Sequence, residues 1–487
     1  MKKAFLILSL AALSLSAAAK VELPSFFSDN MVLQQQTNAA IWGTATPGKK
    51  VTISTGWSGT KTVVTADSKT GKWSTRIATP KAGGPYEITI SDGEALTLSN
   101  VLIGEVWFCS GQSNMEMPFK GYGGQPNAGS AEYIMTAKAS TPIRVCTINK
   151  CSSTKPLDSD SIKTEGWLVN GPRTAATASA TAYWFALKLQ AALDIPVGLL
   201  ITDWGGSSIE TWINEETLRK GFGGEFDFSH LSKDEAPASG NNQKPSLLFN
   251  GQVNPLIPFT FKGMLWYQGE TNRGRCEQYI RLQKAYVEMM RELFQVPQAP
   301  FYFVQIAPYP YGEPERWDSG YFYEAQQKSL DVIPNSGMAV TVDAGEYGTI
   351  HPSNKKAVGD RLAYLALAKT YGMEYIDAVA PTYKETKPGK GIAGNSDLNY
   401  LEVFFNVGPD GMSPMGREVG GFEIAGADKV FHPAKAIMGN RNSFRVWSEE
   451  VPEPVAVRYC FRNWGVGTVF NNYGIPAAPF RTDDWKL

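Results

Sequence analysis

Ser113 and His351 are the residues of this sequence best placed to carry out covalent chemistry. Ser113 stands in "GQSNM", directly after the apolar run "VLIGEVWFC", and His351 follows the apolar run "MAVTV". A serine hydroxyl becomes a nucleophile when a base accepts its proton, and histidine is the usual base because its pKa lies near neutrality. The other histidines, His230 in a polar loop and His432 in a β-rich segment, have no such neighbours in the sequence. The pair predicts acyl transfer.

Donors that can stabilise an oxyanion follow two further apolar runs. Gly205 and Gly206 come after "VGLLIT", and Gln268 and Asn272 come after "GMLWY". Acyl transfer passes through a negatively charged oxygen, and one preorganised N–H donor to it contributes about 3–4 kcal/mol. Because the carboxyl ends of parallel strands meet at one edge of a sheet, we expect these glycines and amides to lie near the serine.

Motifs for other chemistries are missing from the sequence. It contains neither the zinc motif HExxH nor the phosphate-binding pattern GxxxxGK[ST]. It also lacks GxSxG, because Met115 stands where the second glycine of that motif would be, which argues against an ordinary α/β-hydrolase. We therefore expect a serine enzyme with no metal and no cofactor.

A parallel sheet in residues 101–373 would position these groups. Near-continuous apolar runs alternate there with helical stretches such as "CEQYIRLQKAYVEMMRELF". Strands that are apolar throughout indicate a sheet covered by helices on both faces, so the central region is predicted to be an α/β domain.

The flanking regions are predicted to be all-β. Residues 20–100 contain short alternating strands such as "YEITIS", separated by Gly and Pro clusters, and are typical of a small β-sandwich. Residues 374–487 return to short alternating segments such as "LEVFFNV" and are predicted to form a C-terminal β-rich module. Neither region offers an obvious catalytic cluster.

Residues 1–19 are typical of a bacterial secretory signal. Lys2 and Lys3 precede a short apolar segment and a small-residue cleavage site ending at Ala19, which predicts a periplasmic or secreted protein. Loss of the two lysines takes the net charge from −1 to about −3. With a pI near 6.4 and no long basic run, neither nucleic acid nor a membrane is an expected partner of the mature chain. The oligomeric state is left open.

The five cysteines do not form a metal or redox motif. No CxxC pair occurs, and the odd number leaves at least one unpaired within the chain. Cys146 and Cys151 are close enough in the sequence to bridge locally, whereas Cys109 at the end of an apolar run is expected to be a buried thiol.

Four blocks of this sequence together resemble the sialate O-acetylesterases of the SGNH hydrolase superfamily. They are "GEVWFCSGQSNMEMPF", "PVGLLITDWGGSSIETW", "GMLWYQGETN" and "DAGEYGTIHPSNKKAVGDRLA", in that order. The C-terminal segment "VPEPVAVRYCF" and the N-terminal β region are also similar to this family. The resemblance implies an SGNH-like three-layer α/β/α domain flanked by the two β regions.

The resemblance also implies roles for individual residues. Ser113 corresponds to the nucleophile and His351 to the base. The Ser113 N–H, the N–H of Gly205 or Gly206, and the side-chain amide of Gln268 or Asn272 would form the oxyanion hole.

The acid that orients the histidine is the open point of this resemblance. The superfamily often places an aspartate three residues before the histidine, and here that position holds Gly348. Asp343 and Glu346 are the candidates, with Asp343 preferred because it lies at the strand end. A dyad in which a backbone carbonyl orients His351 is the alternative.

The activity implied is removal of O-acetyl groups from a sugar, with sialic acid as the leading substrate. A sialic acid carboxylate favours a bidentate arginine, and Arg273 and Arg275 in "TNRGR" are the candidates, unless they are solvated charges beside a helix. Two alternatives remain open: an esterase acting on acetylxylan or another polysaccharide, and a carbohydrate-binding protein without catalysis.

Overall fold

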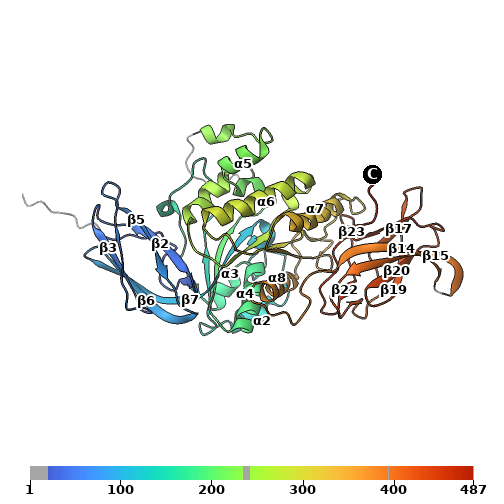
Figure 1. Cartoon of the computed structure of the whole chain (residues 1–487), viewed down its shortest axis with the longest axis horizontal. Helices are drawn as coiled ribbons and strands as arrows, with labels where there is room; N and C mark the ends of the chain where they lie inside the picture. The colour runs from blue at the N-terminus through green and yellow to red at the C-terminus, as the bar shows by residue number, and fades with distance from the viewer. Residues whose placement is uncertain (1–19, 234–241, 393, 486–487) are drawn as a thin grey trace, which may run out of the picture.

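The computed structural model describes residues 20–233, 242–392 and 394–485. A set of strands at the N-terminal end, a central sheet with helices, and a second set of strands at the C-terminal end follow one another along the long axis (Figure 1). This is the predicted fold class, an α/β sheet flanked by two β regions. The signal segment, residues 1–19, lies outside the described residues.

The N-terminal region is built from short strands connected by tight turns. β2 pairs antiparallel with β5, while β3, β4, β6 and β1 assemble beside the first part of β7. The strands are β1 (Val32–Gln34), β2 (Asn38–Thr44), β3 (Lys50–Thr55), β4 (Thr62–Thr65), β5 (Lys72–Ala78), β6 (Gly83–Ser91) and β7 (Ala95–Gly111).

β7 belongs to both the N-terminal and the central regions. Its first part pairs with β6, and its second part, from Glu105 to Gly111, pairs with β10 and β11 of the central sheet. The boundary expected after residue 100 therefore falls within one continuous strand. Because β7 is uninterrupted, the N-terminal strands are rigidly joined to the strand that delivers Ser113.

The central sheet has the order β13-β12-β11-β7-β10-β8-β9, with every pair parallel except β8 and β9. Its strands are buried along nearly their whole length, which explains their continuous apolar sequences. Besides β7 they are β8 (Ile143–Thr147), β9 (Leu168–Val169), β10 (Val197–Asp203), β11 (Gly263–Tyr267), β12 (Phe301–Val304) and β13 (Ser336–Ala339).

Helices cover both faces of this sheet, as a parallel sheet requires. α4 and α8 pack against each other on one face, and α6 and α7 pack together on the other (Figure 1). The helices are α1 (Ser113–Glu116), α2 (Ser130–Thr136), α3 (Pro172–Thr177), α4 (Ala180–Leu193), α5 (Glu215–Phe222), α6 (Cys276–Leu293), α7 (Asp318–Val332) and α8 (Lys355–Lys369).

Local sequence sets the start of the two helices nearest the site. The Ser179 hydroxyl caps α4 by accepting from the N–H of Ala182, and the Asn354 side chain caps α8 by accepting from the N–H of Ala357. The cap at Asn354 ends the loop that carries His351. It therefore fixes where that loop returns to the sheet.

The C-terminal region contains two antiparallel four-stranded sheets, β14-β15-β20-β19 and β18-β17-β21-β23, and the pair β16-β22. The strands are β14 (Thr382–Ile392), β15 (Asn395–Asn406), β16 (Met412–Ser413), β17 (Phe422–Ala425), β18 (Phe431–Pro433), β19 (Lys435–Met438), β20 (Ser443–Trp447), β21 (Ala456–Tyr459), β22 (Phe470–Asn471) and β23 (Phe480–Arg481).

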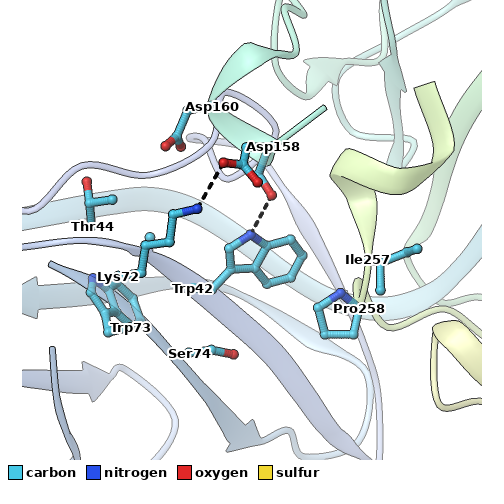
Figure 2. A pocket seen from close by; sticks show the side chains of 11 residues that line it. Trp42, Thr44, Lys72, Trp73, Ser74, Asp158, Asp160, Ile257 and Pro258 are labelled. Carbon is cyan, nitrogen blue, oxygen red and sulfur yellow. Dashed lines mark hydrogen bonds and ion pairs between the residues drawn. The ribbon is translucent and has the colours of Figure 1, made fainter. Parts of the chain in front are cut away.

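The junction between the N-terminal strands and the central region contains an open pocket of about 340 Å³ (Figure 2). The Trp42 indole N–H donates to the Ser159 hydroxyl at 2.9 Å, and Lys72 pairs with Asp158 at 2.9 Å. These contacts fasten strands β2 and β5 to the segment that follows β8.

All five cysteines are free thiols. The local bridge considered for Cys146 and Cys151 is therefore absent, and Cys109 is fully buried as expected. Within the described ranges, no helix is both long and apolar enough to span a membrane.

Candidate active site

Three neighbouring strands of the central sheet end side by side. Gly111 of β7 is in register with Asp203 of β10 and with Tyr267 of β11. Gly111 has a φ of +147°, and a Cβ there would lie 2.2 Å from the Tyr267 carbonyl oxygen, so a side chain at this position would force β7 and β11 apart. Two residues beyond each strand end come Ser113, Gly205 and Gly269.

Ser113 is the first residue of α1. Its N–H belongs to the first helical turn, which leaves it without an acceptor inside the helix. The Ser113 hydroxyl makes no hydrogen bond to any residue that the structure describes, while its carbonyl oxygen accepts from the Tyr122 hydroxyl at 3.2 Å. A hydroxyl without a hydrogen-bond partner, close to the ends of three strands, can attack a bound ester.

The loop that carries His351 is tied to the loop that carries Ser113. The Asn114 side-chain N–H₂ donates to the Ile350 carbonyl at 3.2 Å, which joins the residue after the serine to the residue before the histidine. The Tyr122 ring also lies edge-on to the imidazole, with centroids 5.3 Å apart. The structure thus brings the two predicted residues into one site.

Gln125 is the partner of the imidazole. His351 Nδ1 lies 2.8 Å from Gln125 Oε1, and an amide oxygen only accepts, so Nδ1 carries the proton and Nε2 presents its lone pair. Burial lowers the pKa of His351, and the Lys355 charge lowers it further, while Glu116 acts in the opposite direction. A neutral imidazole with a free Nε2 is the form that a general base requires.

Asp343 is not the partner of His351, contrary to the prediction. Both of its carboxylate oxygens are bound by Arg361 of α8, at 2.7 and 2.6 Å, and Arg361 also donates to the Val340 carbonyl. This bidentate pair is mostly buried and anchors the segment after β13 to α8. Glu346, the second candidate, accepts from the N–H and hydroxyl of Ser353 and so shapes the turn around His351.

Gly205 lies against Ser113, but its N–H is already engaged. A Cβ at Gly205 would be 3.2 Å from the Ser113 Cβ, and the Gly205 N–H donates to the Glu116 carboxylate. The N–H of Gly206 makes no hydrogen bond to another described residue. Of the two predicted glycines, Gly206 therefore has the available donor.

Glu116 stands at the centre of a charged cluster. Its other carboxylate oxygen pairs with Lys150 at 2.6 Å. Burial raises the pKa of Asp203 to about 7, with the Glu116 charge contributing and the Lys150 charge opposing. Near neutral pH the Asp203 carboxyl is therefore protonated in part of the molecules, which lowers the negative charge close to Ser113.

Gln268 and Asn272 both lie close to the site, and both direct their amides into the protein. Gln268 Nε2 donates to the Ser207 carbonyl at 3.1 Å and to Asn272 Oδ1 at 2.7 Å. Asn272 accepts from the Ile209 N–H at 3.0 Å and donates to Glu210 at 3.0 Å. Instead of facing an oxyanion, these amides hold the loop that presents Gly205 and Gly206.

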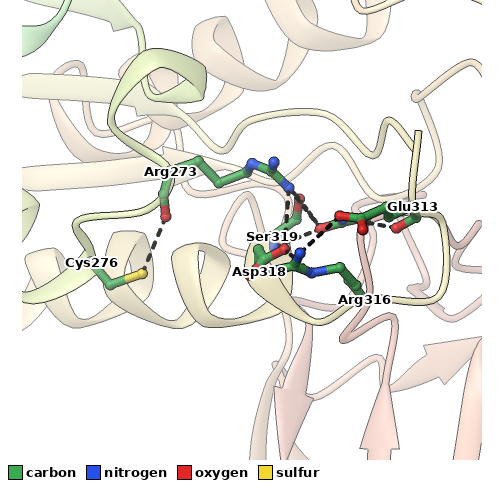
Figure 3. A network of polar contacts seen from close by, with 7 residues as sticks. Arg273, Cys276, Glu313, Arg316, Asp318 and Ser319 are labelled. Atoms are coloured by element: carbon green, nitrogen blue, oxygen red, sulfur yellow. Dashed lines mark hydrogen bonds and ion pairs between the residues drawn. The ribbon is translucent and has the colours of Figure 1, made fainter. Parts of the chain in front are cut away.

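Arg273 and Arg275 are also bound to the protein. Arg273 donates to Asn463 of the C-terminal region at 2.8 Å and stacks on Tyr311 at 3.7 Å. Its guanidinium group also points toward Ser319 and Asp318 (Figure 3). Arg275 pairs with Glu210 at 2.7 Å. In the structure these guanidinium groups support loops, and Arg275 is the more exposed of the two.

The sequence did not predict the buried polar network that lies beneath Ser113. Lys355 is fully buried and donates to Asn114 Oδ1 at 2.7 Å, while Asn114 Nδ2 donates to Glu270 Oε1 at 2.7 Å. Burial lowers the pKa of Lys355 to about 7 and raises that of Glu270. This network joins the blocks that hold Ser113, Glu270 and His351.

No group of three or more His, Cys, Asp and Glu side chains within the described ranges is arranged to hold a metal ion. His230 is buried, with Nε2 2.9 Å from the Pro245 carbonyl oxygen, and His432 lies 3.1 Å from Glu450. The groups near the strand ends that could act on a substrate are a hydroxyl, an imidazole and backbone N–H donors.

Comparisons with known proteins agree with this geometry. A family profile described as "carbohydrate esterase, sialic acid-specific acetylesterase" matches residues 103–368. Mouse sialate O-acetylesterase is 29% identical over 454 residues, covering 81% of each chain, and the human enzyme is 28% identical, covering 75% of this chain and 74% of its own.

A solved structure extends the similarity to nearly the whole chain. A carbohydrate acetylesterase from Xanthomonas citri superposes with a TM-score of 0.82 at 31% identity, over 96% of this chain and 100% of that one. The profile spans more than half of this chain, including the Ser113 and His351 blocks. The chain therefore belongs to the carbohydrate esterase family of sialic acid-specific acetylesterases, and it is a carboxylic ester hydrolase.

Proposed function

We propose that the protein removes O-acetyl groups from carbohydrates through an acetyl-Ser113 intermediate. The Ser113 oxygen attacks the acetyl carbonyl carbon while His351 Nε2 accepts the hydroxyl proton. The bond from the carbonyl carbon to the sugar oxygen then breaks, and His351 returns its proton to that oxygen. Water, activated in the same way, attacks the acetyl group and releases acetate.

The observation that carries this proposal is the 2.8 Å contact between His351 Nδ1 and Gln125 Oε1. Gln125 fixes the proton on Nδ1, so Nε2 is the lone pair available to the Ser113 hydroxyl. A neutral partner orients the imidazole without strongly stabilising its charged form. The enzyme is then expected to keep His351 neutral, and therefore basic, below its ordinary pKa of about 6.5.

Backbone N–H groups would supply the oxyanion hole. Ser113 and Gly206 have N–H donors free to receive the oxyanion. Gly205 would join them only if Glu116 released its N–H. Each donor is worth about 3–4 kcal/mol of transition-state stabilisation.

Acetylated sialic acid is the first candidate substrate. The family profile names it, and the mouse and human relatives are sialate O-acetylesterases. A sialic acid carries a carboxylate, so one arginine would have to leave its present partner to bind it. Arg275 is the better placed, because it is more exposed than Arg273.

A neutral acetylated polysaccharide such as xylan is the second candidate. The observation in its favour is that Arg273 and Arg275 are both already bound to Asn463 and Glu210. A neutral sugar needs no cation, so these contacts would stay intact. The Xanthomonas citri neighbour is described only as a carbohydrate acetylesterase, which fits either candidate.

Acetate release measured on acetylated sialic acids and on acetylated xylan separates the two. A higher kcat/KM on the sialic acids, lost selectively in Arg275→Ala, supports the first candidate. Activity on xylan that is insensitive to this change supports the second. Failure to release acetate from any acetylated sugar would refute the proposed function.

We also propose that the enzyme works in the periplasm or outside the cell. The support is the sequence of residues 1–19, with its two lysines, short apolar segment and small-residue site. Mass spectrometry of the protein from its native cells should give a mature N-terminus near Lys20. An intact N-terminus on a protein found in the cytoplasm would refute this location.

A further inference from the structure

An exposed tyrosine and a half-buried tryptophan form an aromatic pair at the loop that leads to His351. Tyr347, four residues before His351, is 58% exposed. Its ring lies edge-on to that of Trp464, with centroids 5.3 Å apart and planes at 86°. We propose that Tyr347 and Trp464 form a binding platform for neutral pyranose units of an acetylated polysaccharide. This proposal rests on the proposed function and favours its second candidate.

The position of Tyr347 is fixed by the same turn that holds His351. Glu346 and Thr349 pair through their backbones on either side of it, and the Glu346 carboxylate accepts from the Ser353 N–H at 2.7 Å. Four residues of extended chain span at most about 14 Å, and a turn spans less. Tyr347 is therefore within a few sugar units of the reacting ester.

Trp464 reaches this position from the C-terminal region. Its backbone N–H donates to the Pro314 carbonyl at 3.1 Å, and the backbone N–H of the neighbouring Asn463 donates to the Arg316 carbonyl at 2.7 Å. Three residues further on, the Gly467 N–H donates to the Val342 carbonyl at 3.1 Å, in the segment that leads to His351. The C-terminal region would thus contribute directly to substrate binding.

The chemistry of the pair suits a neutral sugar. A pyranose ring presents C–H groups on its faces and hydroxyls at its edge. Tyrosine and tryptophan offer a flat apolar surface together with a polar O–H or N–H. Neither side chain carries a charge at neutral pH, so the platform selects for ring shape instead of for a carboxylate.

The test compares Tyr347→Ala and Trp464→Ala on two kinds of substrate. On acetylated xylo-oligosaccharides we expect kcat/KM to fall about tenfold in each variant, mainly through KM, since truncating an aromatic anchor commonly costs more than 1 kcal/mol. On p-nitrophenyl acetate, which is too small to reach the platform, kcat/KM should stay unchanged. Trp464→Phe keeps a ring in place and should retain most of the oligosaccharide activity.

Tyr375→Ala is the matched control. Tyr375 is 83% exposed and lies beyond the far end of α8, a helix of 15 residues and hence about 22 Å long, so its removal should leave both activities unchanged. Equal losses on both substrates in the platform variants, or no loss on the oligosaccharides, would overturn the platform. A wild-type enzyme that cleaves no acetylated sugar would instead overturn the proposed function, and the platform with it.

Discussion

Replacing Gln125 by alanine should lower kcat/KM only modestly. The change removes the acceptor 2.8 Å from His351 Nδ1 and leaves the Tyr122 ring and the neighbouring loops in place. A neutral hydrogen bond contributes about 0.5–1.5 kcal/mol, which corresponds to a loss of roughly 2- to 12-fold. An aspartate in this position of a serine triad is worth about 10⁴-fold, so the two kinds of partner are easily distinguished.

Gln125→Glu should move the pH profile. A carboxylate at this position would favour the imidazolium, and an opposite charge at this range raises a histidine pKa by about 1–3 units. Since only neutral His351 accepts the Ser113 proton, the acidic limb of kcat/KM should shift to higher pH by that amount. In the wild type that limb should lie below about pH 6.5, because burial and the Lys355 charge lower the pKa of His351.

The assay is kcat/KM for p-nitrophenyl acetate from about pH 5 to 9, measured on the wild type and both variants. Gln36→Glu, which adds the same charge at an exposed position of the N-terminal region, is the control and should leave the profile unchanged. A loss near 10⁴-fold in Gln125→Ala, or an acidic limb that Gln125→Glu leaves in place, would refute the assignment of Gln125 as the positioning residue.

Three further outcomes follow from the same contacts. Asp343→Asn should lower the free energy of unfolding in urea by about 3–5 kcal/mol, because it leaves the buried Arg361 charge unpaired. The folded enzyme should keep most of its activity. A loss of kcat/KM of about 10⁴-fold would instead show that Asp343 is the acid that orients His351. The raised pKa of Asp203, about 7 against an ordinary 3.8, means that the folded protein holds a proton which the unfolded chain releases. The unfolding free energy should therefore fall by at most about 4 kcal/mol between about pH 4 and 7, and Asp203→Asn should flatten that slope in urea titrations; an unchanged slope would contradict the burial argument. Arg275→Ala removes the ion-pair partner of Glu210, which keeps only its hydrogen bond with Asn272, and should lower thermal stability, whereas an unchanged melting temperature would show that the pair is only a surface contact.

The framework of the site could be predicted because it depends on local sequence. Apolar runs mark the strands, and the residues after each run meet at one edge of a parallel sheet. Gly111, Asp203 and Tyr267 are in register, so the residues two positions further on necessarily come together. This is why Ser113 and the glycine pair could be expected to lie together without any knowledge of the loops.

The partners of these residues could not be predicted in the same way. Gln125 and His351 are 226 residues apart, and only the fold of the loop after α1 brings them together. Asp343 had the expected residue type and sequence position, but Arg361 of α8 binds both of its carboxylate oxygens. Hydrogen-bond partners depend on tertiary geometry that strand-end positions do not encode.

The hydrogen-bond partners of Gln268 and Asn272 could not be predicted either. Gln268 and Asn272 occur at the expected strand end, yet each finds acceptors and donors inside the loop that it supports. The network of Lys355, Asn114 and Glu270 joins three blocks that look independent in the sequence. A lysine in the first turn of a helix ordinarily indicates a solvated charge, so nothing in its pattern pointed to burial.

Trapping the acetyl-enzyme is the most direct test of the proposed acetyl-Ser113 intermediate. The enzyme is mixed with p-nitrophenyl acetate, quenched rapidly in acid and digested, and the peptides are analysed by mass spectrometry. We expect one acetyl group on Ser113 in the wild type and none in Ser113→Ala, whose kcat/KM should fall by at least about 10⁴-fold. Acetylation of a different residue during turnover, or full activity in Ser113→Ala, would contradict it.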